Sequence, residues 1–258
     1  QAKKVDGKRA KELEGMAGNL RFLTRNAPRT FWQAAQLAWL YSVVAHTLDY
    51  GRMDDYLGPF LKRDLQEGRI DMAFAQRIVD SLWLLIADKK TTVHGRVVIG
   101  GRGRRDEEAA DLFARCAMEA SRRVRRGEPQ LSLRCYDGMN REILKEALNL
   151  LGEGTTFPIL YNDDATVPAV SRALRVPEEE AAQYYPFGCG EYVIAGKSFG
   201  SPNGVINLAR VLELTLQDEE AEDFETFYQN YLERIRWYVE ALAAQEAQEY
   251  RAAGKAAD

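Results

Sequence analysis

The sequence predicts a protein of the α/β class, in which strands and helices alternate along the chain. Three short runs support this prediction, because each is rich in strand-forming residues and is bounded by turn-forming ones. They occupy residues 93–103, 130–138 and 155–163. Longer segments with helical spacing of apolar residues lie between and around these runs. Alternation of this kind is typical of α/β proteins.

Helical spacing predicts helices along most of the remaining chain. The first is dense in alanine, leucine and aromatic residues and has Thr30 as its candidate N-cap. The third ends in an arginine-rich turn that complements the helix dipole, and the fifth begins with Pro177 followed by glutamates. The predicted helices span residues 30–48, 70–90, 106–127, 142–154, 176–185, 203–216 and 223–250.

Glycine and proline separate several of these segments. Gly51, Gly58 and Pro59 interrupt the helical period, so a loop is predicted over 51–60. The segment 187–196 has no helical period and lies between glycines, which indicates non-helical backbone. No internal repeat, low-complexity linker or domain boundary is visible, so residues 1–258 are expected to form a single piece.

Composition and cysteine usage narrow the class of function. The 258 residues are 46% hydrophobic and 29% charged with a formal net charge of −4, which favours a globular protein and gives no general reason to bind nucleic acid or membrane. Cys116, Cys135 and Cys189 are widely spaced and form no CxxC pair, which argues against a disulfide framework and a metal site. Since no targeting or membrane segment is visible, we expect a cytoplasmic protein with a small-molecule partner.

The strongest candidate for chemistry is the segment Gly188-Cys189-Gly190-Glu191. Extended backbone would place the Cys189 and Glu191 side chains on one face, and the flanking glycines would let a substrate approach closely. A carboxylate beside a thiol disfavours the thiolate, so the pair suits a thiol that gives up a hydrogen atom while the carboxylate removes a proton. The competing interpretation is structural, with Cys189 as a small buried hydrophobe and Glu191 as a surface charge.

Four segments, in order, resemble glycyl radical enzymes of the pyruvate formate-lyase-like superfamily. Residues 187–216 resemble the cysteine loop, in which a Gly-Cys-x-Glu segment enters a barrel and is followed by a helix. His46-Thr47 and the following GRMDDYLGPF resemble a His-Ser pair that precedes Gly-Arg-x-Asp-Gln-Tyr and a Pro-aromatic pair. RVVIGG and the run PQLSLRCYDGMNREILKEALNLLGEGTTFPILYND resemble the segments before the cysteine loop.

The resemblance implies a fold and a set of site residues. The chain would form part of a ten-stranded α/β barrel with surrounding helices and a cysteine loop. Cys189 matches the thiyl cysteine, and Glu191 matches the general base of dehydratase-like and lyase members. His46 and Thr47 match the His-Ser pair that contacts substrate, with His46 as candidate acid, whereas His94 and Asn203 are weaker candidates for substrate binding.

The resemblance also implies an activity and its requirements. We expect a dehydratase- or lyase-like enzyme in which a thiyl radical abstracts hydrogen from a small polar substrate before C–O, C–N or C–C cleavage. The glycyl radical would be installed by a radical-SAM activase, yet no Arg-Val-x-Gly-Tyr-like loop is present in this sequence. The chain is therefore expected to be inactive alone. Its partners would be the activase and the rest of the enzyme or a chain bearing the radical glycine, and a homodimer is a further candidate.

The sequence differs from the family pattern at several positions, and two other functions are alternatives. Pyruvate formate-lyase itself uses two adjacent cysteines, whereas Gly188 precedes Cys189 here, so acetyl transfer between CoA and formate is not expected. Asp55 stands where relatives carry glutamine. The alternatives are a cysteine hydrolase that pairs Cys189 with a histidine, and a non-catalytic α/β scaffold. Substrate and leaving group do not follow from the sequence.

Overall fold

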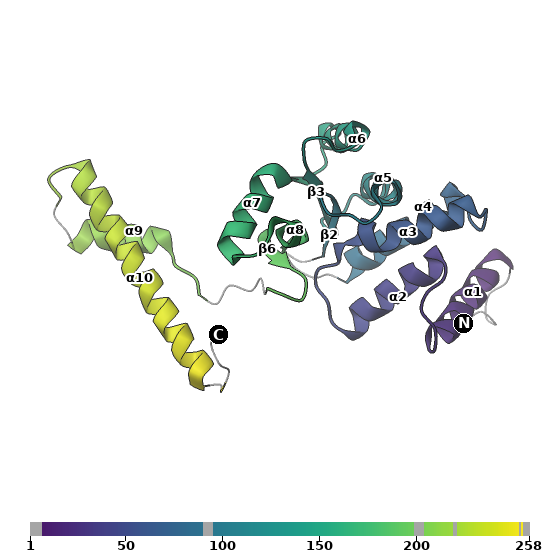
Figure 1. Cartoon of the computed structure of the whole chain (residues 1–258), viewed down its shortest axis with the longest axis horizontal. Coiled ribbons are helices and arrows are strands. Elements are labelled where there is room, and N and C mark those ends of the chain that lie inside the picture. The colour runs from purple at the N-terminus through teal and green to yellow at the C-terminus, as the bar shows by residue number, and fades with distance from the viewer. Residues whose placement is uncertain (1–6, 90–94, 199–203, 219–220, 253, 255–258) are drawn as a thin grey trace. The chain divides into compact units, whose positions relative to one another are not determined.

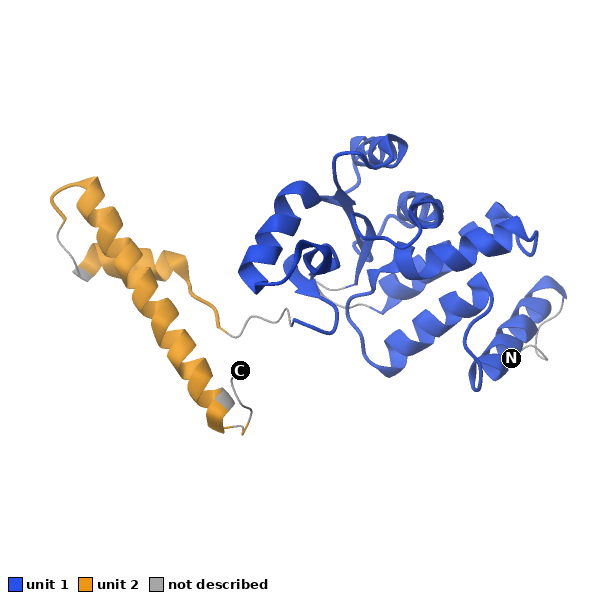
Figure 2. Cartoon of the chain, in the orientation of Figure 1, with its two compact units in different colours: residues 1–200 blue, residues 201–258 orange. Residues whose placement is uncertain are grey.

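The structure of the protein, a computed structural model, describes residues 7–89, 95–198, 204–218, 221–252 and 254. The chain divides into two compact units, residues 1–200 and residues 201–258 (Figure 2). No change of composition marks this division in the sequence. The larger unit carries all the described strands and the cysteine segment.

The larger unit is built on a four-stranded, fully parallel sheet in the order β1-β2-β3-β4. Its three longer strands fall within the three runs that the sequence predicted, whereas β1 is a two-residue strand that the sequence did not indicate. Every residue of β2 is buried, as expected of a strand covered on both faces. The strands are β1 (Gly51–Arg52), β2 (Arg96–Gly100), β3 (Gln130–Cys135) and β4 (Ile159–Asn162).

Helices α3, α4 and α5 lie on one side of this sheet in Figure 1, with the main hydrophobic core between them and the strands. Local capping explains several helix starts: Thr30 accepts a hydrogen bond from the Gln33 N–H, and Asp106 accepts one from the Ala109 N–H. The helices of this unit are α1 (Gly7–Leu23), α2 (Phe31–Val44), α3 (Met53–Gln66), α4 (Met72–Asp88), α5 (Glu107–Val124), α6 (Arg141–Gly152), α7 (Asp163–Leu174) and α8 (Glu178–Ala181).

The loop predicted over 51–60 is wrong, because helix α3 runs through most of it with Pro59 inside. The helix forms because it packs closely against α5. A Cβ on Gly58 would lie 2.5 Å from the Ala109 carbonyl oxygen, so this glycine permits close packing of α3 on α5. Buried Leu57 and Leu61 on the same helix add apolar contacts that offset the hydrogen bond lost at proline.

Two further differences from the sequence prediction lie before the cysteine segment. Helix α7 was not predicted, although Asn162 caps it by accepting a hydrogen bond from the Asp164 N–H. The helix predicted over 176–185 is shorter than expected, since α8 ends at Ala181 and the chain then turns into a strand.

That strand is half of a two-stranded antiparallel hairpin formed by β5 (Tyr184–Phe187) and β6 (Glu191–Ile194). Strand β5 contacts β1 and β2. In Figure 1 the hairpin and α8 lie on the side of the sheet opposite to α3, α4 and α5. A smaller hydrophobic cluster that includes Val170, Tyr184 and Ile194 holds α7, α8 and the hairpin together. The fold thus lays the cysteine segment across one face of the parallel sheet.

The described residues of the smaller unit form two helices, α9 (Leu208–Asp218) and α10 (Phe224–Ala252), both within segments predicted to be helical apart from their ends. They pack against each other, and the Tyr231 hydroxyl donates to the Leu208 carbonyl at 3.3 Å. Throughout the described residues, helices of the length and apolarity needed to cross a membrane are absent.

Candidate active site

Cys189 lies at the tip of the hairpin, in the three-residue connection between Phe187 and Glu191. Both neighbouring glycines have positive φ, +52° at Gly188 and +129° at Gly190. The conformation of Gly190 is essentially restricted to glycine, and a Cβ there would lie 3.1 Å from the Tyr161 hydroxyl. The sequence around the cysteine is therefore what allows a tight turn with an exposed thiol.

Glu191 is drawn toward this tip by a local hydrogen bond. The Gly190 N–H donates to the Glu191 carboxylate at 3.2 Å and also to the Phe187 carbonyl at 2.8 Å. The backbone is non-helical, as the sequence predicted, but the φ of Gly190 departs from strand geometry. Strict alternation of side chains thus does not apply across 189–191, and the turn itself, rather than an extended strand, sets where Cys189 and Glu191 lie.

Arg96, the first residue of β2, holds the tip from the sheet side. Its guanidinium donates to the Gly188 carbonyl, at 2.8 Å from Nη2 and 3.3 Å from Nε. The same group donates to the Ser132 hydroxyl at 2.7 Å and to the Gln130 side-chain oxygen at 3.1 Å. Arg96 is 2% exposed, so these bonds replace the water that a guanidinium would otherwise bind.

Asp49 holds the same glycine through its N–H. One carboxylate oxygen accepts from the Gly188 N–H at 3.1 Å, and the other accepts from the backbone N–H of Arg96 at 3.0 Å. Since Asp49 follows His46 by three positions, the segment that the sequence singled out for substrate contact is joined to the cysteine turn.

The two candidates within that segment have different surroundings. His46 is exposed, with a φ of +51°, just beyond the end of α2. Thr47 is half-buried: its N–H donates to the Ser42 carbonyl at 3.1 Å, and its carbonyl accepts from the Lys89 ammonium at 2.5 Å. The other two candidates, His94 and Asn203, lie outside the described residues.

Two more buried arginines fix the base of the hairpin. Arg134 of β3 donates to the Tyr184 carbonyl at 2.7 Å and the Ala182 carbonyl at 2.9 Å. Arg52 of β1 donates to the Ala182 carbonyl at 3.3 Å and the Gln183 side chain at 3.2 Å. Three neighbouring strands therefore each contribute one arginine that binds the backbone of the cysteine hairpin or of the residues leading into it.

Tyr161 is a site residue that the sequence analysis did not single out. It lies on β4, with its hydroxyl facing Gly190 and 3.5 Å from an Arg96 nitrogen. Burial raises the pKa of Tyr161, and the nearby Glu191 acts in the same direction. A neutral phenol next to the turn is able to donate a hydrogen bond to an oxygen bound there. The one feature of the sequence that could have pointed to Tyr161 is its position within the predicted strand 155–163.

Glu128, just before β3, is the most perturbed carboxyl group near the site. Burial raises its pKa to about 7, and the negative charge of Asp49 acts in the same direction. One of its oxygens is buried without a hydrogen-bond partner. Hydrogen bonds from Gln130 lower its pKa, and Gln130 also accepts from Arg96. Glu128 is thus two hydrogen bonds away from the arginine that holds the cysteine turn.

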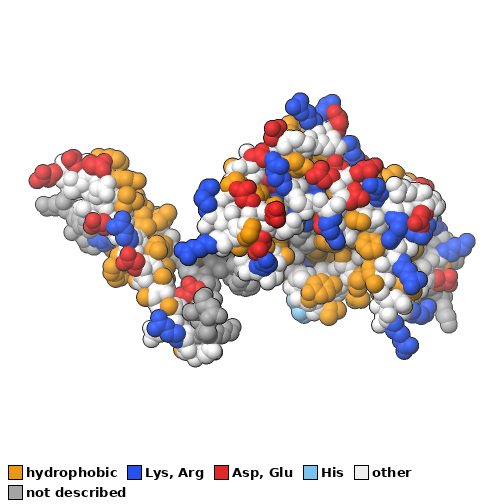
Figure 3. All heavy atoms as spheres, viewed as in Figure 1, with side chains coloured by type: hydrophobic (Ala, Val, Ile, Leu, Met, Phe, Trp, Pro, Cys, Tyr) orange, Lys and Arg blue, Asp and Glu red, His pale blue; other side chains and the backbone are white. Residues whose placement is uncertain are grey.

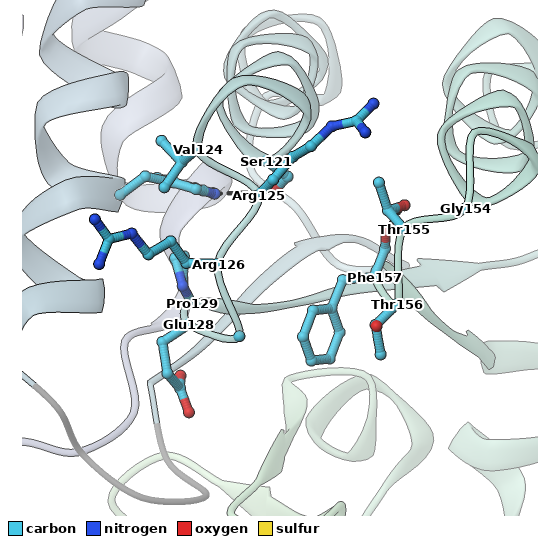
Figure 4. Close-up of a pocket in the computed structure, with 12 residues that line it drawn as sticks. Ser121, Val124, Arg125, Arg126, Glu128, Pro129, Gly154, Thr155, Thr156 and Phe157 are labelled. Atoms are coloured by element: carbon cyan, nitrogen blue, oxygen red, sulfur yellow. Dashed lines mark hydrogen bonds between the residues drawn. The ribbon is translucent and has the colours of Figure 1, made fainter.

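Two cavities differ in their relation to this site. One of about 480 Å³ lies between α2 and α3 and is lined mainly by apolar side chains together with Thr47, Asp49 and Tyr50. Hydrophobic side chains are also visible on the surface of the larger unit (Figure 3). The other, of about 240 Å³, lies where α5 and α6 end and β3 begins (Figure 4). Neither Cys189 nor Glu191 lines either cavity, but Asp49, which binds the Gly188 N–H, lines the first and not the second. The first cavity is therefore the better candidate to adjoin a substrate site.

The comparison with known proteins identifies the family. Residues 1–256 match the family model described as pyruvate formate lyase-like. The chain belongs to this family. A probable dehydratase, YbiW of Escherichia coli K12, is 28% identical over 234 residues, which cover 81% of this chain and 29% of that protein. The isethionate sulfite-lyase of Nitratidesulfovibrio vulgaris Hildenborough is 29% identical over 238 residues, which cover 83% of this chain and 28% of that protein.

Structural comparison agrees with this assignment. A glycyl radical enzyme from Archaeoglobus fulgidus has a TM-score of 0.78 and 26% sequence identity, over 91% of this chain and 34% of that one. The α/β fold expected from the resemblance is thus confirmed, and the four described parallel strands form an open part of the barrel. The chain spans less than a third of the length of the curated relatives named above. Among described residues, no group of three or more His, Cys, Asp or Glu could hold a metal ion.

Proposed function

We propose that this chain is the central catalytic part of a glycyl radical dehydratase or lyase, with Cys189 as the hydrogen-abstracting residue and Glu191 as the base. The observation that carries the proposal is the exposed thiol at a rigidly held turn, with a carboxylate bonded into the same turn. The family assignment and the names of the dehydratase and sulfite-lyase relatives support this reaction class. No observation on the described residues favours the hydrolase or the scaffold alternative.

A glycyl radical, installed by a radical-SAM activase in a part of the enzyme outside this chain, would supply the unpaired electron. Cys189 would receive it by giving up its thiol hydrogen atom. The Cys189 sulfur then takes a hydrogen atom from a substrate C–H next to a hydroxyl group. Glu191 accepts the proton of that hydroxyl. The substrate radical expels its leaving group from the neighbouring carbon. The product radical takes a hydrogen atom from the Cys189 thiol, which returns the sulfur to its radical form for the next substrate.

His46 and Thr47 are proposed to serve the substrate side of this reaction. His46 would protonate the leaving group when that group departs as hydroxide or an amine, and Thr47 would bind a polar substituent. Their segment is tied to the cysteine turn through Asp49, which supports a shared pocket. His94 and Asn203 remain proposed pocket residues. The substrate would be small and polar, carrying a hydroxyl group next to the carbon that loses the leaving group.

The proposal is tested in the full-length enzyme, activated anaerobically by its radical-SAM partner. Isethionate and 1,2-propanediol serve as probes, with sulfite release and propanal formation as readouts, because one reports lyase and the other dehydratase chemistry. We expect one product in the wild type, and none in Cys189→Ala or, beyond a trace, in Glu191→Gln. The organic radical signal in electron paramagnetic resonance should persist in both variants, because the cysteine acts after the radical is installed.

A matched control is Cys116→Ala, since Cys116 is buried in the core of the larger unit and lies outside the site. Its product formation should equal that of the wild type. Product formation by Cys189→Ala at the wild-type rate would contradict the assignment. Absence of both products from an enzyme with a full radical signal would leave Cys189 to be tested against other hydroxylated probes, and would exclude these two substrates.

A further inference from the structure

The residue that precedes the proposed hydrogen-abstracting cysteine is held at both of its backbone polar groups by side chains from elsewhere in the chain. The Gly188 carbonyl accepts from the Arg96 guanidinium, 92 residues away. The Gly188 N–H donates to the Asp49 carboxylate, 139 residues away. Arg96 and Asp49 are also joined to each other, because the Arg96 backbone N–H donates to the Asp49 carboxylate. The three residues form a closed set, which we call the Gly188 clamp.

The clamp is rigid because Arg96 is itself fixed. Its guanidinium is planar and delocalised. Nη1 donates to the Ser132 hydroxyl, and Nη2, which also binds Gly188, donates to the Gln130 side-chain oxygen; both acceptors lie on β3. Both of those residues belong to the neighbouring parallel strand, so the arginine cannot rotate without breaking its bonds to β3 and to the cysteine turn. A lysine would keep the charge but could not donate in this fixed fork.

The turn needs such external support. Gly188 and Gly190 both have positive φ, and glycine loses more conformational freedom on ordering than any other residue. Cys189 between them is exposed and gains little from burial. The hydrogen bonds within the turn, from Gly190 to Phe187 and Glu191, fix the far side of the cysteine. The clamp is what fixes the near side.

We propose that Asp49 and Arg96 are positioning residues that set the place of the Cys189 sulfur by gripping Gly188. The inference rests on the proposed function of Cys189 and adds the device that orients it. Hydrogen-atom transfer requires the donor and acceptor atoms to be held in close and defined geometry. A misplacement of about 1 Å can slow an enzyme roughly 100-fold. The clamp acts on the cysteine through backbone alone, so its loss should slow transfer without removing any reacting group.

The test measures hydrogen transfer at Cys189 without any substrate. In D₂O the thiol proton of Cys189 exchanges with solvent, so the thiol carries deuterium. When the sulfur gives its deuterium atom to the glycyl radical and later takes back the protium atom, deuterium remains on the radical carbon. The doublet in the electron paramagnetic resonance spectrum, which arises from that hydrogen, then collapses toward a singlet. The collapse rate in the activated full-length enzyme reports the transfer.

We expect Asp49→Asn and Arg96→Lys to slow this collapse roughly 10- to 100-fold, with the number of radical spins per chain unchanged. The control Arg123→Gln removes an exposed arginine on the last turn of α5 and should exchange like the wild type. Because both clamp residues act on Gly188, the double variant should be no slower than about the slower single variant. Independent effects that multiply would contradict the clamp.

The outcomes separate this inference from the proposed function. Collapse in Cys189→Ala at the wild-type rate would remove the proposed function itself. No collapse in Cys189→Ala, together with wild-type collapse in both clamp variants, would keep the function and overturn the clamp. A variant that takes up no radical is assessed by amide hydrogen exchange of peptides spanning 184–194 in the unactivated enzyme. There, Asp49→Asn should expose the Gly188 amide to faster exchange, and unchanged protection would overturn the clamp.

Discussion

Arg134 and Asp163 form an ion pair whose two side chains are both fully buried. The pairing is bidentate, with the Arg134 Nε donating at 2.9 Å and Nη2 at 2.7 Å to the two carboxylate oxygens. The Tyr184 hydroxyl donates to the same carboxylate at 2.8 Å. Because Arg134 belongs to β3, Asp163 begins α7 and Tyr184 begins β5, this pair joins the sheet to the base of the cysteine hairpin.

Removal of one partner of this pair should be strongly destabilising, because it leaves the other charge buried without compensation. We expect Asp163→Asn or Arg134→Met to lower the free energy of unfolding by about 3–5 kcal/mol. Urea denaturation monitored by circular dichroism would measure the change. The double variant Arg134→Met/Asp163→Leu should lose less than the sum of the single variants. Arg210→Gln, which breaks an exposed pair with Glu213, should cost at most about 1 kcal/mol. Equal losses in buried and exposed variants would contradict this account.

The parts of the fold that the sequence predicted correctly are those in which local signals agree with tertiary packing. Strands β2, β3 and β4 lie within runs bounded by turn residues, and Thr30 caps α2 as its chemistry suggests. Helix α3 was missed because Gly58 and Pro59 are locally helix-breaking. The helix is stabilised by packing of Gly58 on the backbone of Ala109, which is 51 positions further along the chain. No local pattern carries that information.

The candidate site also contains residues that the sequence singled out and residues that it did not. Cys189 and Glu191 were found because their chemistry and their glycine setting are adjacent in sequence. Asp49, Arg96 and Tyr161 were not singled out, because their roles arise from contacts that only the folded chain creates. Arg96 is the first residue of a strand whose other residues are apolar or glycine. No neighbouring residue in the sequence indicates that Arg96 binds Gly188, 92 residues away. Sequence reasoning thus singled out the candidate reacting groups and missed the residues that hold them.

The raised pKa of Glu128 predicts a specific dependence of stability on pH. Below its ordinary value of 4.5 the group is protonated in both states, whereas between 4.5 and about 7 the unfolded chain loses the proton and the folded chain keeps it. Glu128 therefore favours unfolding increasingly as pH rises through this window, and its penalty is complete above about 7. Glu128→Gln should raise the melting temperature relative to wild type more at pH 8 than at pH 5.

Differential scanning calorimetry at both pH values would measure this difference. Comparison of the two proteins at each pH cancels the titration of every other group. Glu142→Gln, at an exposed glutamate in the first turn of α6, serves as the control and should show little dependence of its effect on pH. A gain for Glu128→Gln that is equal at pH 5 and pH 8 would show that this carboxyl group titrates normally in the folded protein.

The three cysteines should differ sharply in their reactivity toward iodoacetamide. Cys189 is exposed at the hairpin tip, whereas Cys116 is buried in α5 and Cys135 is half-buried at the end of β3. Burial raises the pKa of both Cys116 and Cys135 to about 11, so at pH 8 few of these thiols are ionised. Mass spectrometry of a labelling time course should find carbamidomethyl at Cys189 first. The other two should be labelled only as the protein unfolds in urea.

Early labelling of Cys116 would contradict its place in the core. A labelling rate constant of Cys189 that exceeds that of free glutathione by orders of magnitude would instead favour a hydrolase nucleophile. A hydrolase requires an activated thiolate, whereas hydrogen-atom transfer does not.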